Sequence, residues 1–197
     1  MQVNELFTQP NTILLDGGMG TMLQARGLSI GEWPELAALE HPDWLEDIHR
    51  AYVEAGAQIL CANTFGANRE KLGRTGRTVE EVVPPSVEIA RRAARGRALV
   101  ALDVGPTGQL LEPTGTLRFE EAVDIFAQTV RAGVQAGADL ILIETMTDLQ
   151  EARAALLAAK ENSSLPVIVT MTYEERGRTF LGCDPASAAL TLEGMGA

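Results

Sequence analysis

The sequence predicts an α/β fold in which a parallel sheet is built from successive strand-helix units. Short, strongly apolar runs recur along the chain, each ends in a polar or glycine-rich turn, and each is followed by a segment with helical periodicity. The 197 residues are 46% hydrophobic and 22% charged, which is typical of one globular domain or part of a larger one. No low-complexity linker or charge block divides them, so residues 1–197 are interpreted as one domain.

Five strands are predicted from continuous apolar stretches rather than alternating ones. Such stretches are typical of parallel strands whose two faces are both buried. The predicted strands cover residues 13–16, 58–61, 98–104, 140–144 and 167–171.

About five helices are predicted between and after these strands. Apolar residues recur at helical spacing within residues 45–55, 119–130 and 149–159, and a last helix is expected at 185–192. A further apolar pattern runs through residues 79–94, where Pro84 and Pro85 interrupt it. Because the residue before a proline avoids the helical region, we expect this helix to begin near Pro85.

The ends of the predicted helices carry residues that favour them. Gly56 and Gly137 stand just before a following strand, where a left-handed residue commonly ends a helix. Asp148 and Glu151 have the spacing of a capping box at a helix start. These local signals agree with the strand-helix order.

The charge balance disfavours two classes of partner. Sixteen Lys and Arg residues stand against 27 Asp and Glu residues, a net charge of −11 that repels nucleic acids and anionic membranes. No N-terminal segment has the pattern of a signal peptide and no apolar run approaches roughly 18 residues, so we expect a cytoplasmic protein. Cys61 and Cys183 are too few and too far apart for a disulfide framework or a self-contained zinc site.

Two carboxylates end otherwise apolar strands, Asp16 after the first and Glu144 after the fourth. Parallel α/β folds bind ligands at these carboxyl ends, and a carboxylate that loses water there needs a cation or hydrogen-bond donors. A ligand ammonium group would suit both residues. The alternatives are that Asp16 caps the turn that follows it and that Glu144 bonds to neighbouring loops.

Other polar residues follow the second and third strands. Asn63 and Thr64 are candidates for hydrogen bonds to a ligand, with turn stabilisation as the alternative. Asp103 is the third carboxylate at a strand end, and a Gly-Pro turn follows it directly, so holding the loop at residues 105–108 is favoured over a role toward a ligand.

A glycine-rich turn follows Asp16, with the sequence Gly-Gly-Met-Gly-Thr at residues 17–21. Gly17 and Gly18 allow backbone N–H groups to approach a ligand closely, and a helix that starts here could hold an anion such as a carboxylate. The turn lacks the spacing of a dinucleotide-binding fingerprint and no Walker-type lysine follows it, so nucleotide binding is not favoured.

Four motifs together resemble the landmarks of homocysteine S-methyltransferases. They are Asp-Gly-Gly-Met-Gly-Thr at 16–21, Cys-Ala-Asn-Thr-Phe-Gly-Ala-Asn at 61–68, Gly-Pro-Thr-Gly-Gln-Leu-Leu-Glu-Pro at 105–113 and Ile-Glu-Thr at 143–145. They occur in order over essentially the whole chain. Within the family they most resemble the N-terminal homocysteine-binding barrel of cobalamin-dependent methionine synthases.

The resemblance implies a (β/α)8 TIM barrel of which this chain holds about the first five βα units. It implies that Asp16 and Glu144 hold the ammonium group of homocysteine, that the turn from Gly17 and Gly18 to Thr21 offers donors to its carboxylate, and that Asn63 and Thr64 belong to the same substrate site. The substrate thiolate would be bound to Zn²⁺ and would attack a methyl donor. Methyl-cobalamin supplied by methyltetrahydrofolate is the favoured donor, with betaine and S-methylmethionine as alternatives.

The family's zinc ligands are three cysteines that follow the sixth and eighth strands, and this chain ends before both positions. Cys61 and Cys183 do not occupy them, so the chain alone is expected to be inactive. An alternative interpretation is a non-catalytic truncated barrel fragment that self-associates through its open sheet edges. A third, a TIM-barrel enzyme for phosphorylated substrates, calls for a strand-end lysine, which neither Lys71 nor Lys160 provides.

Overall fold

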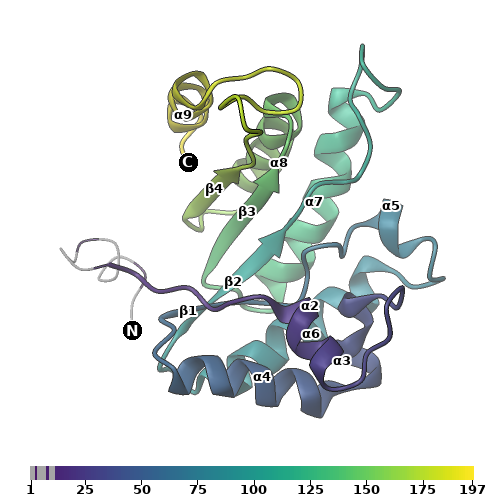
Figure 1. The fold of residues 1–197 in the computed structure, drawn as a ribbon, viewed down its shortest axis with the longest axis vertical. Helices are drawn as coiled ribbons and strands as arrows, with labels where there is room; N and C mark the ends of the chain where they lie inside the picture. The colour runs from purple at the N-terminus through teal and green to yellow at the C-terminus, as the bar shows by residue number, and fades with distance from the viewer. Residues whose placement is uncertain (1–2, 4–7, 9–11) are drawn as a thin grey trace.

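A four-stranded parallel sheet forms the centre of the structure, a computed structural model that describes residue 3, residue 8 and residues 12–197 (Figure 1). The strands are β1 (Ile59–Cys61), β2 (Leu99–Val104), β3 (Leu140–Met146) and β4 (Val167–Met171), and they lie side by side in sequence order. All three neighbouring pairs are parallel, and helices connect them. The predicted α/β class is therefore confirmed.

The helices predicted from apolar spacing are present. In the described residues the helical elements are α2 (Met19–Ala25), η1 (Pro34–Leu36), α3 (Ala37–Glu40), α4 (Pro42–Glu54), α5 (Arg69–Leu72), α6 (Val79–Ala94), α7 (Phe119–Gln135), α8 (Leu149–Asn162) and α9 (Pro185–Gly194). Gly56 and Gly137 follow α4 and α7 with φ angles of 105° and 90°. The predicted use of glycine at these two helix ends is confirmed.

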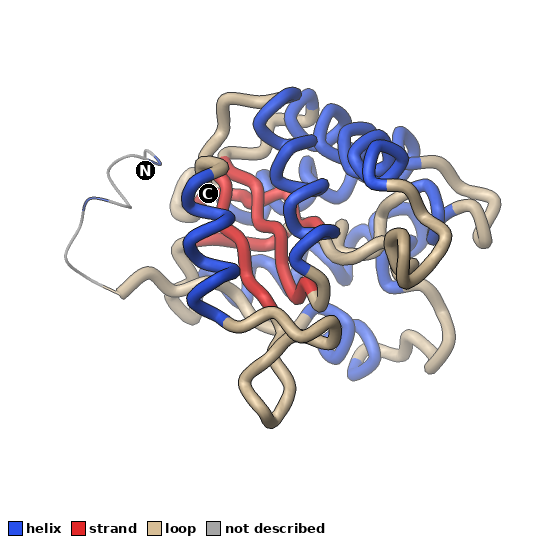
Figure 2. The backbone as a smooth tube through the Cα atoms, turned by 90° about the horizontal axis from the view of Figure 1, so that it is seen from above, coloured by secondary structure: helices blue, strands red, loops and turns tan. Residues whose placement is uncertain are grey.

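The two faces of the sheet pack differently. Helices α4, α6, α7 and α8 cover one face, where the largest apolar cluster lies between helices and strands (Figure 2). The opposite face carries a smaller cluster of alternating strand residues, Ile59, Leu99, Ala101, Leu140 and Leu142. Because side chains alternate along a strand, the polar residues that follow these cluster residues by two positions lie on the same face of the sheet.

The predicted first strand at residues 13–16 is not formed as a strand. Leu15 makes an isolated parallel bridge to Ile59, and the Asp16 N–H donates to the Ile59 carbonyl at 3.0 Å. Leu14 and Leu15 are exposed, and the segment is paired only with β1, which is three residues long. Such a short ladder does not make a regular strand, but it places Asp16 beside Cys61.

Helix α6 begins at Val79, so the prediction of a start near Pro85 is wrong. Thr78 forms a capping box, because its Oγ1 accepts from the Glu81 N–H at 3.3 Å and its own N–H donates to Glu81 Oε2 at 2.9 Å. Pro84 and Pro85 lie in the second turn, where each lacks the N–H that would bond to the carbonyl four residues earlier. The cap and the burial of the first turn outweigh those two missing bonds.

The capping box predicted at the start of α8 forms only in part. Asp148 Oδ1 accepts from the Gln150 N–H at 3.0 Å, as an N-cap does. Glu151 instead accepts from both the N–H and the hydroxyl of Thr107, at 2.7 and 2.6 Å. The buried Glu151 thus anchors the loop that follows β2.

Candidate functional site

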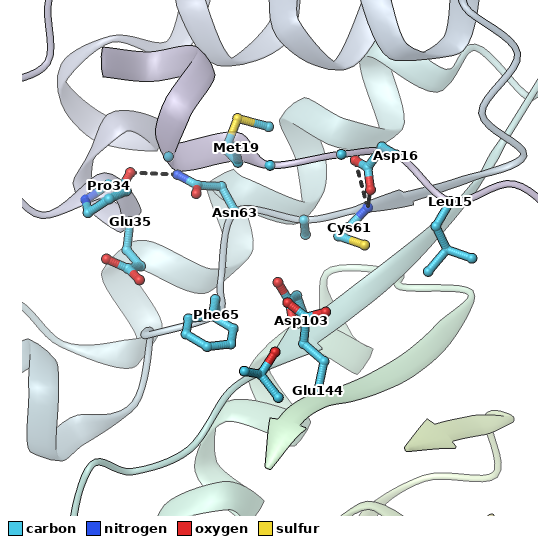
Figure 3. A pocket seen from close by; sticks show the side chains of 15 residues that line it. Leu15, Asp16, Met19, Pro34, Glu35, Cys61, Asn63, Phe65, Asp103 and Glu144 are labelled. Atoms are coloured by element: carbon cyan, nitrogen blue, oxygen red, sulfur yellow. Dashed lines mark hydrogen bonds between the residues drawn. The ribbon is translucent and has the colours of Figure 1, made fainter. Parts of the chain in front are cut away.

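A cavity of about 500 Å³ opens at the carboxyl ends of β1, β2 and β3 (Figure 3). Its walls come from the segment before α2, from η1 and from the three strand ends. The lining residues are Leu15, Asp16, Gly17, Gly18, Met19, Gly20, Pro34, Glu35, Cys61, Ala62, Asn63, Phe65, Asp103, Glu144 and Thr145. The cavity therefore brings together polar residues from sequence positions more than 120 residues apart.

Asp16 is held at the cavity wall by the backbone of β1. Both of its carboxylate oxygens lie 3.0 Å from the Cys61 nitrogen, whose N–H donates to them, and its side chain is 2% exposed. Burial, the largest influence, raises the pKa of Asp16 to about 6 although the Cys61 N–H opposes this. The alternative in which Asp16 caps its own following turn is wrong, since its bonds go across to β1.

Glu144 enters the cavity from an irregular part of β3. The ladder between β3 and β4 shifts register between Ile143 and Met146, and Thr145 has a φ of 60°, a left-handed conformation. The half-buried Glu144 carboxylate accepts no hydrogen bond from the part of the chain that the structure describes. Burial raises its pKa, so this group is desolvated without a protein partner.

The glycine turn forms a second wall of the cavity. Gly17, Gly18 and Gly20 line it, and α2 begins at Met19 with Gly18 as an N-cap that has no side chain to offer. The first N–H groups of such a helix lack partners within the helix. Thr21 does not line the cavity, and its hydroxyl donates to the Gly18 carbonyl at 3.1 Å.

The structure separates the two polar residues that follow β1. Asn63 lines the cavity, and its side-chain amide donates to the Pro34 carbonyl at 2.6 Å. Thr64 is buried outside the lining, where its hydroxyl donates to the Asp103 carbonyl at 2.7 Å and accepts from the Asp103 N–H at 3.1 Å. Thr64 therefore holds the backbone at the end of β2 from outside the cavity lining.

Asp103 and Glu35 also line the cavity, Asp103 as the third strand-end acid and Glu35 as a residue to which no sequence pattern points. The interpretation that Asp103 holds the loop at 105–108 is wrong, because Glu151 bonds to Thr107 instead. Burial first, and then the carboxylates of Glu144, Asp16 and Glu35, raise the pKa of Asp103 well above its usual value. Asp103 follows Ala101 by two residues, so its side chain lies on the same face of the sheet as the smaller apolar cluster.

The cysteines do not provide a zinc site. Burial raises the pKa of the Cys61 thiol, which disfavours the thiolate that binds zinc. Cys183 follows β4 in a loop, where its thiol donates to the Asp184 carbonyl at 3.4 Å. Over residues 12–197 and the two described residues before them, no group of three His, Cys, Asp or Glu side chains is arranged to hold a metal ion. The described residues therefore do not fit the family's zinc.

Among the described residues, no helix is both long and apolar enough to cross a bilayer.

Comparisons with known proteins converge on one family. The sequence profile described as homocysteine S-methyltransferase matches residues 13–197. Methionine synthase of Mycobacterium leprae (strain TN) is 31% identical over 92% of this chain, and betaine–homocysteine S-methyltransferase 1 of Mus musculus is 31% identical over 94%. The chain spans only 16% and 46% of the lengths of these two relatives.

A solved structure shows the same fold. The metallated form of the homocysteine methyltransferase MmuM from Escherichia coli matches 98% of this chain with a TM-score of 0.86, at 24% identity, and the match covers 74% of that chain. The four strands in this order, with helices on one face, are thus a large part of a closed TIM barrel. The chain belongs to the homocysteine S-methyltransferase family.

Proposed function

We propose that the cavity binds the amino acid end of homocysteine, with the ammonium group between Asp16 and Glu144. The observation that carries the proposal is that two desolvated carboxylates, one of them without a protein partner, face the same cavity. A buried carboxylate is stabilised when a cation replaces its lost water. The ammonium of an amino acid supplies that charge together with hydrogen-bond donors.

The substrate carboxylate fits the opposite wall in this proposal. Gly17 and Gly18 line the cavity and carry no side chains that would keep a ligand away from their backbone. The backbone of this turn can therefore approach a ligand closely, and its N–H groups would serve as donors to an anion. Thr21 would support this turn through its bond to Gly18.

Asn63 and Thr64 take different parts in the proposed site. The Asn63 side chain reaches the cavity while its amide is tied to the Pro34 carbonyl, so it would orient η1 and leave its oxygen for the ligand. Thr64 would act indirectly, since it holds the backbone of Asp103.

The whole protein's activity is proposed to be methyl transfer to the homocysteine thiolate, which gives methionine. The 31% sequence identity to a methionine synthase supports this reaction, and methyl-cobalamin with methyltetrahydrofolate is the favoured donor. Betaine is the alternative that the second relative's name supports, and S-methylmethionine is the other alternative. Because the described residues offer no zinc site, the role proposed for this chain alone is head-group binding without methyl transfer.

The test uses L-methionine, which carries the same amino acid end and does not oxidise to a disulfide. Its binding to the 197-residue chain is followed by backbone amide shifts in NMR titrations. We expect saturable shifts at residues 17–20 and an affinity at least tenfold weaker in Glu144→Gln, since an ionic hydrogen bond contributes about 1.5–3 kcal/mol. Glu54→Gln, an exposed change on α4, serves as the control.

Two results would contradict the head-group proposal. One is the absence of saturable binding to the wild-type chain. The other is equal affinity in Glu144→Gln and Glu54→Gln, which would show that the Glu144 carboxylate contributes nothing. Methionine formation from homocysteine by the chain alone would overturn the proposal that it lacks methyl-transfer activity.

A second candidate function is self-association of this chain as a non-catalytic module. The observation that favours it is that two large apolar side chains in the segment after β4 are exposed, Phe180 at 60% and Leu190 at 75%. Size-exclusion chromatography with light scattering tests it. A concentration-dependent dimer that Leu190→Lys abolishes is expected, and a monomer at all concentrations would rule it out.

A further inference from the structure

Asp103 lies between the other carboxyl side chains that line the cavity. It lies near the end of β2, the strand between β1 with Cys61 and β3 with Glu144. Its side chain follows Ala101 on the face of the sheet away from the helices, and Figure 3 shows it directed into the cavity close to Glu144. The cavity thus has a carboxyl group on each of two neighbouring strands.

The Asp103 carboxyl is buried without a partner. The residue is 6% exposed, and within the described part of the chain its Oδ1 atom has no hydrogen-bond partner. Its backbone is fixed, because both its N–H and its carbonyl bond to the Thr64 hydroxyl. Burial of an unsatisfied carboxyl group costs free energy, so a group retained in this position calls for a ligand that satisfies it.

The neighbouring charges decide which kind of ligand fits. Asp16, Glu144 and Glu35 surround Asp103 with negative charge, which together with burial raises its pKa. An anion or a neutral acceptor would add repulsion or leave the oxygen unsatisfied. A cation relieves the repulsion of all these carboxyl groups at once.

The number of N–H donors on an amino acid ammonium equals the number of carboxyl groups that Asp16, Asp103 and Glu144 provide. A primary ammonium has three N–H donors, whereas the proposed site supplies carboxylates from Asp16 and Glu144 alone. We propose that Asp103 accepts the third hydrogen bond of the ligand's ammonium and so makes the site specific for a free amino group. This inference rests on the proposed function, because it assigns a third acceptor to the same ligand group.

The experiment compares L-methionine with its desamino analogue, 4-(methylsulfanyl)butanoate, on the wild-type chain and on Asp103→Asn. Asparagine keeps the size of the side chain and loses its charge. We expect methionine affinity to fall at least tenfold in Asp103→Asn while the affinity for the analogue changes less than twofold. Asp124→Asn, an exposed change on α7, is the matched control and should change neither affinity.

A measurement on the wild-type chain tests the same proposal without depending on whether the Asp103→Asn variant folds. The side-chain carboxyl ¹³C resonance of Asp103 should shift on titration with methionine, with the same midpoint as the amides of residues 17–20, and should not shift with the analogue. A carboxyl resonance that responds equally to both ligands would overturn the proposal.

The outcomes separate this inference from the function on which it rests. If Glu144→Gln weakens methionine binding and Asp103→Asn does not, the third acceptor is wrong and the head-group site stands. If Asp103→Asn weakens both ligands equally, the residue acts on the shape of the cavity and the proposed specificity is wrong. If the wild-type chain does not prefer methionine over the analogue, both proposals fail.

Discussion

The Nδ1 atom of His49 lies 3.8 Å from an Asp16 carboxylate oxygen, and the two side chains are 0% and 2% exposed. Burial lowers the pKa of His49 to about 4 and raises that of Asp16 to about 6. In the folded protein both groups are therefore neutral between about pH 4 and pH 6, and only Asp16 becomes charged above that range. Helix α4 thus places an uncharged imidazole ring beside Asp16 at neutral pH.

Replacement of His49 by leucine should change how stability depends on pH. The pKa of His49 is lower in the folded protein than in the unfolded chain, so as the pH falls from 6.5 to 4 the unfolded chain binds the proton first and wild-type stability drops. The loss amounts to roughly 3 kcal/mol at pH 4. His49→Leu lacks this loss, and urea unfolding at pH 7, 5.5 and 4.5 measures it. Parallel stability curves for the two proteins would show that His49 does not titrate in this way.

Acidification should weaken the binding of L-methionine. Protonated Asp16 cannot pair with an ammonium, so affinity should be fully developed above the Asp16 pKa of about 6 and fall below it, by up to tenfold per pH unit. Glu144, whose pKa is also raised by burial, acts in the same direction. NMR titrations at pH 5, 6 and 7 measure the dependence, and Asp16→Asn should reduce it to the part that comes from Glu144. Equal affinities at pH 5 and pH 7 in the wild-type chain would contradict the ion pair.

The order of strands and helices could be predicted because it depends on local patterns. The apolar runs at 98–104, 140–144 and 167–171 meet β2, β3 and β4 within two residues at each end. Residues 13–16 have the same pattern but pair only with the short β1, and strand formation depends on a ladder that sequence patterns do not report. The predicted start of α6 near Pro85 is wrong because the Thr78 cap and the packing of the first turn outweigh the two prolines.

The site could be predicted only where strand ends bear charge. Asp16, Asp103 and Glu144 stand out as carboxylates at the ends of apolar runs, and all three line the cavity. Glu35 lies in η1, far from any strand in sequence, and reaches the cavity because its Oε1 accepts from the Gly66 N–H at 2.8 Å. Thr64 follows a strand as Asn63 does but turns inward to β2, a difference of side-chain direction that residue type does not reveal.

Removal of the Glu151 side chain should destabilise the fold. Glu151→Ala leaves the N–H and hydroxyl of buried Thr107 without their acceptor, at a cost of about 1–3 kcal/mol. Glu151→Gln keeps a side-chain oxygen and should lose less. Urea unfolding checks both, with Glu161→Ala on the exposed face of α8 as the control. A loss in Glu151→Ala no larger than in the control would mean that the loop after β2 is held by other contacts.

Gly105 should not tolerate a side chain, because it packs directly against a cavity residue. A Cβ at this position would lie 2.5 Å from the Phe65 ring and 2.7 Å from the Phe65 carbonyl oxygen, which already accepts from the Gly105 N–H at 2.9 Å. Gly105→Ala must therefore displace Phe65, which lines the cavity, and we expect a loss of stability of about 1–3 kcal/mol together with weaker methionine binding.

Gly194→Ala is the matched control for this change, since no atom lies within 4 Å of the added Cβ and the position is in α9. Gly194 is the last residue of α9 and has no positive φ angle, so alanine fits there and this variant should be about as stable as the wild type. Thermal unfolding and methionine titration of both variants make the comparison. If Gly105→Ala matches Gly194→Ala in stability and affinity, the close approach of Phe65 does not shape the cavity, and the backbone at Gly105 is free to move away from the ring.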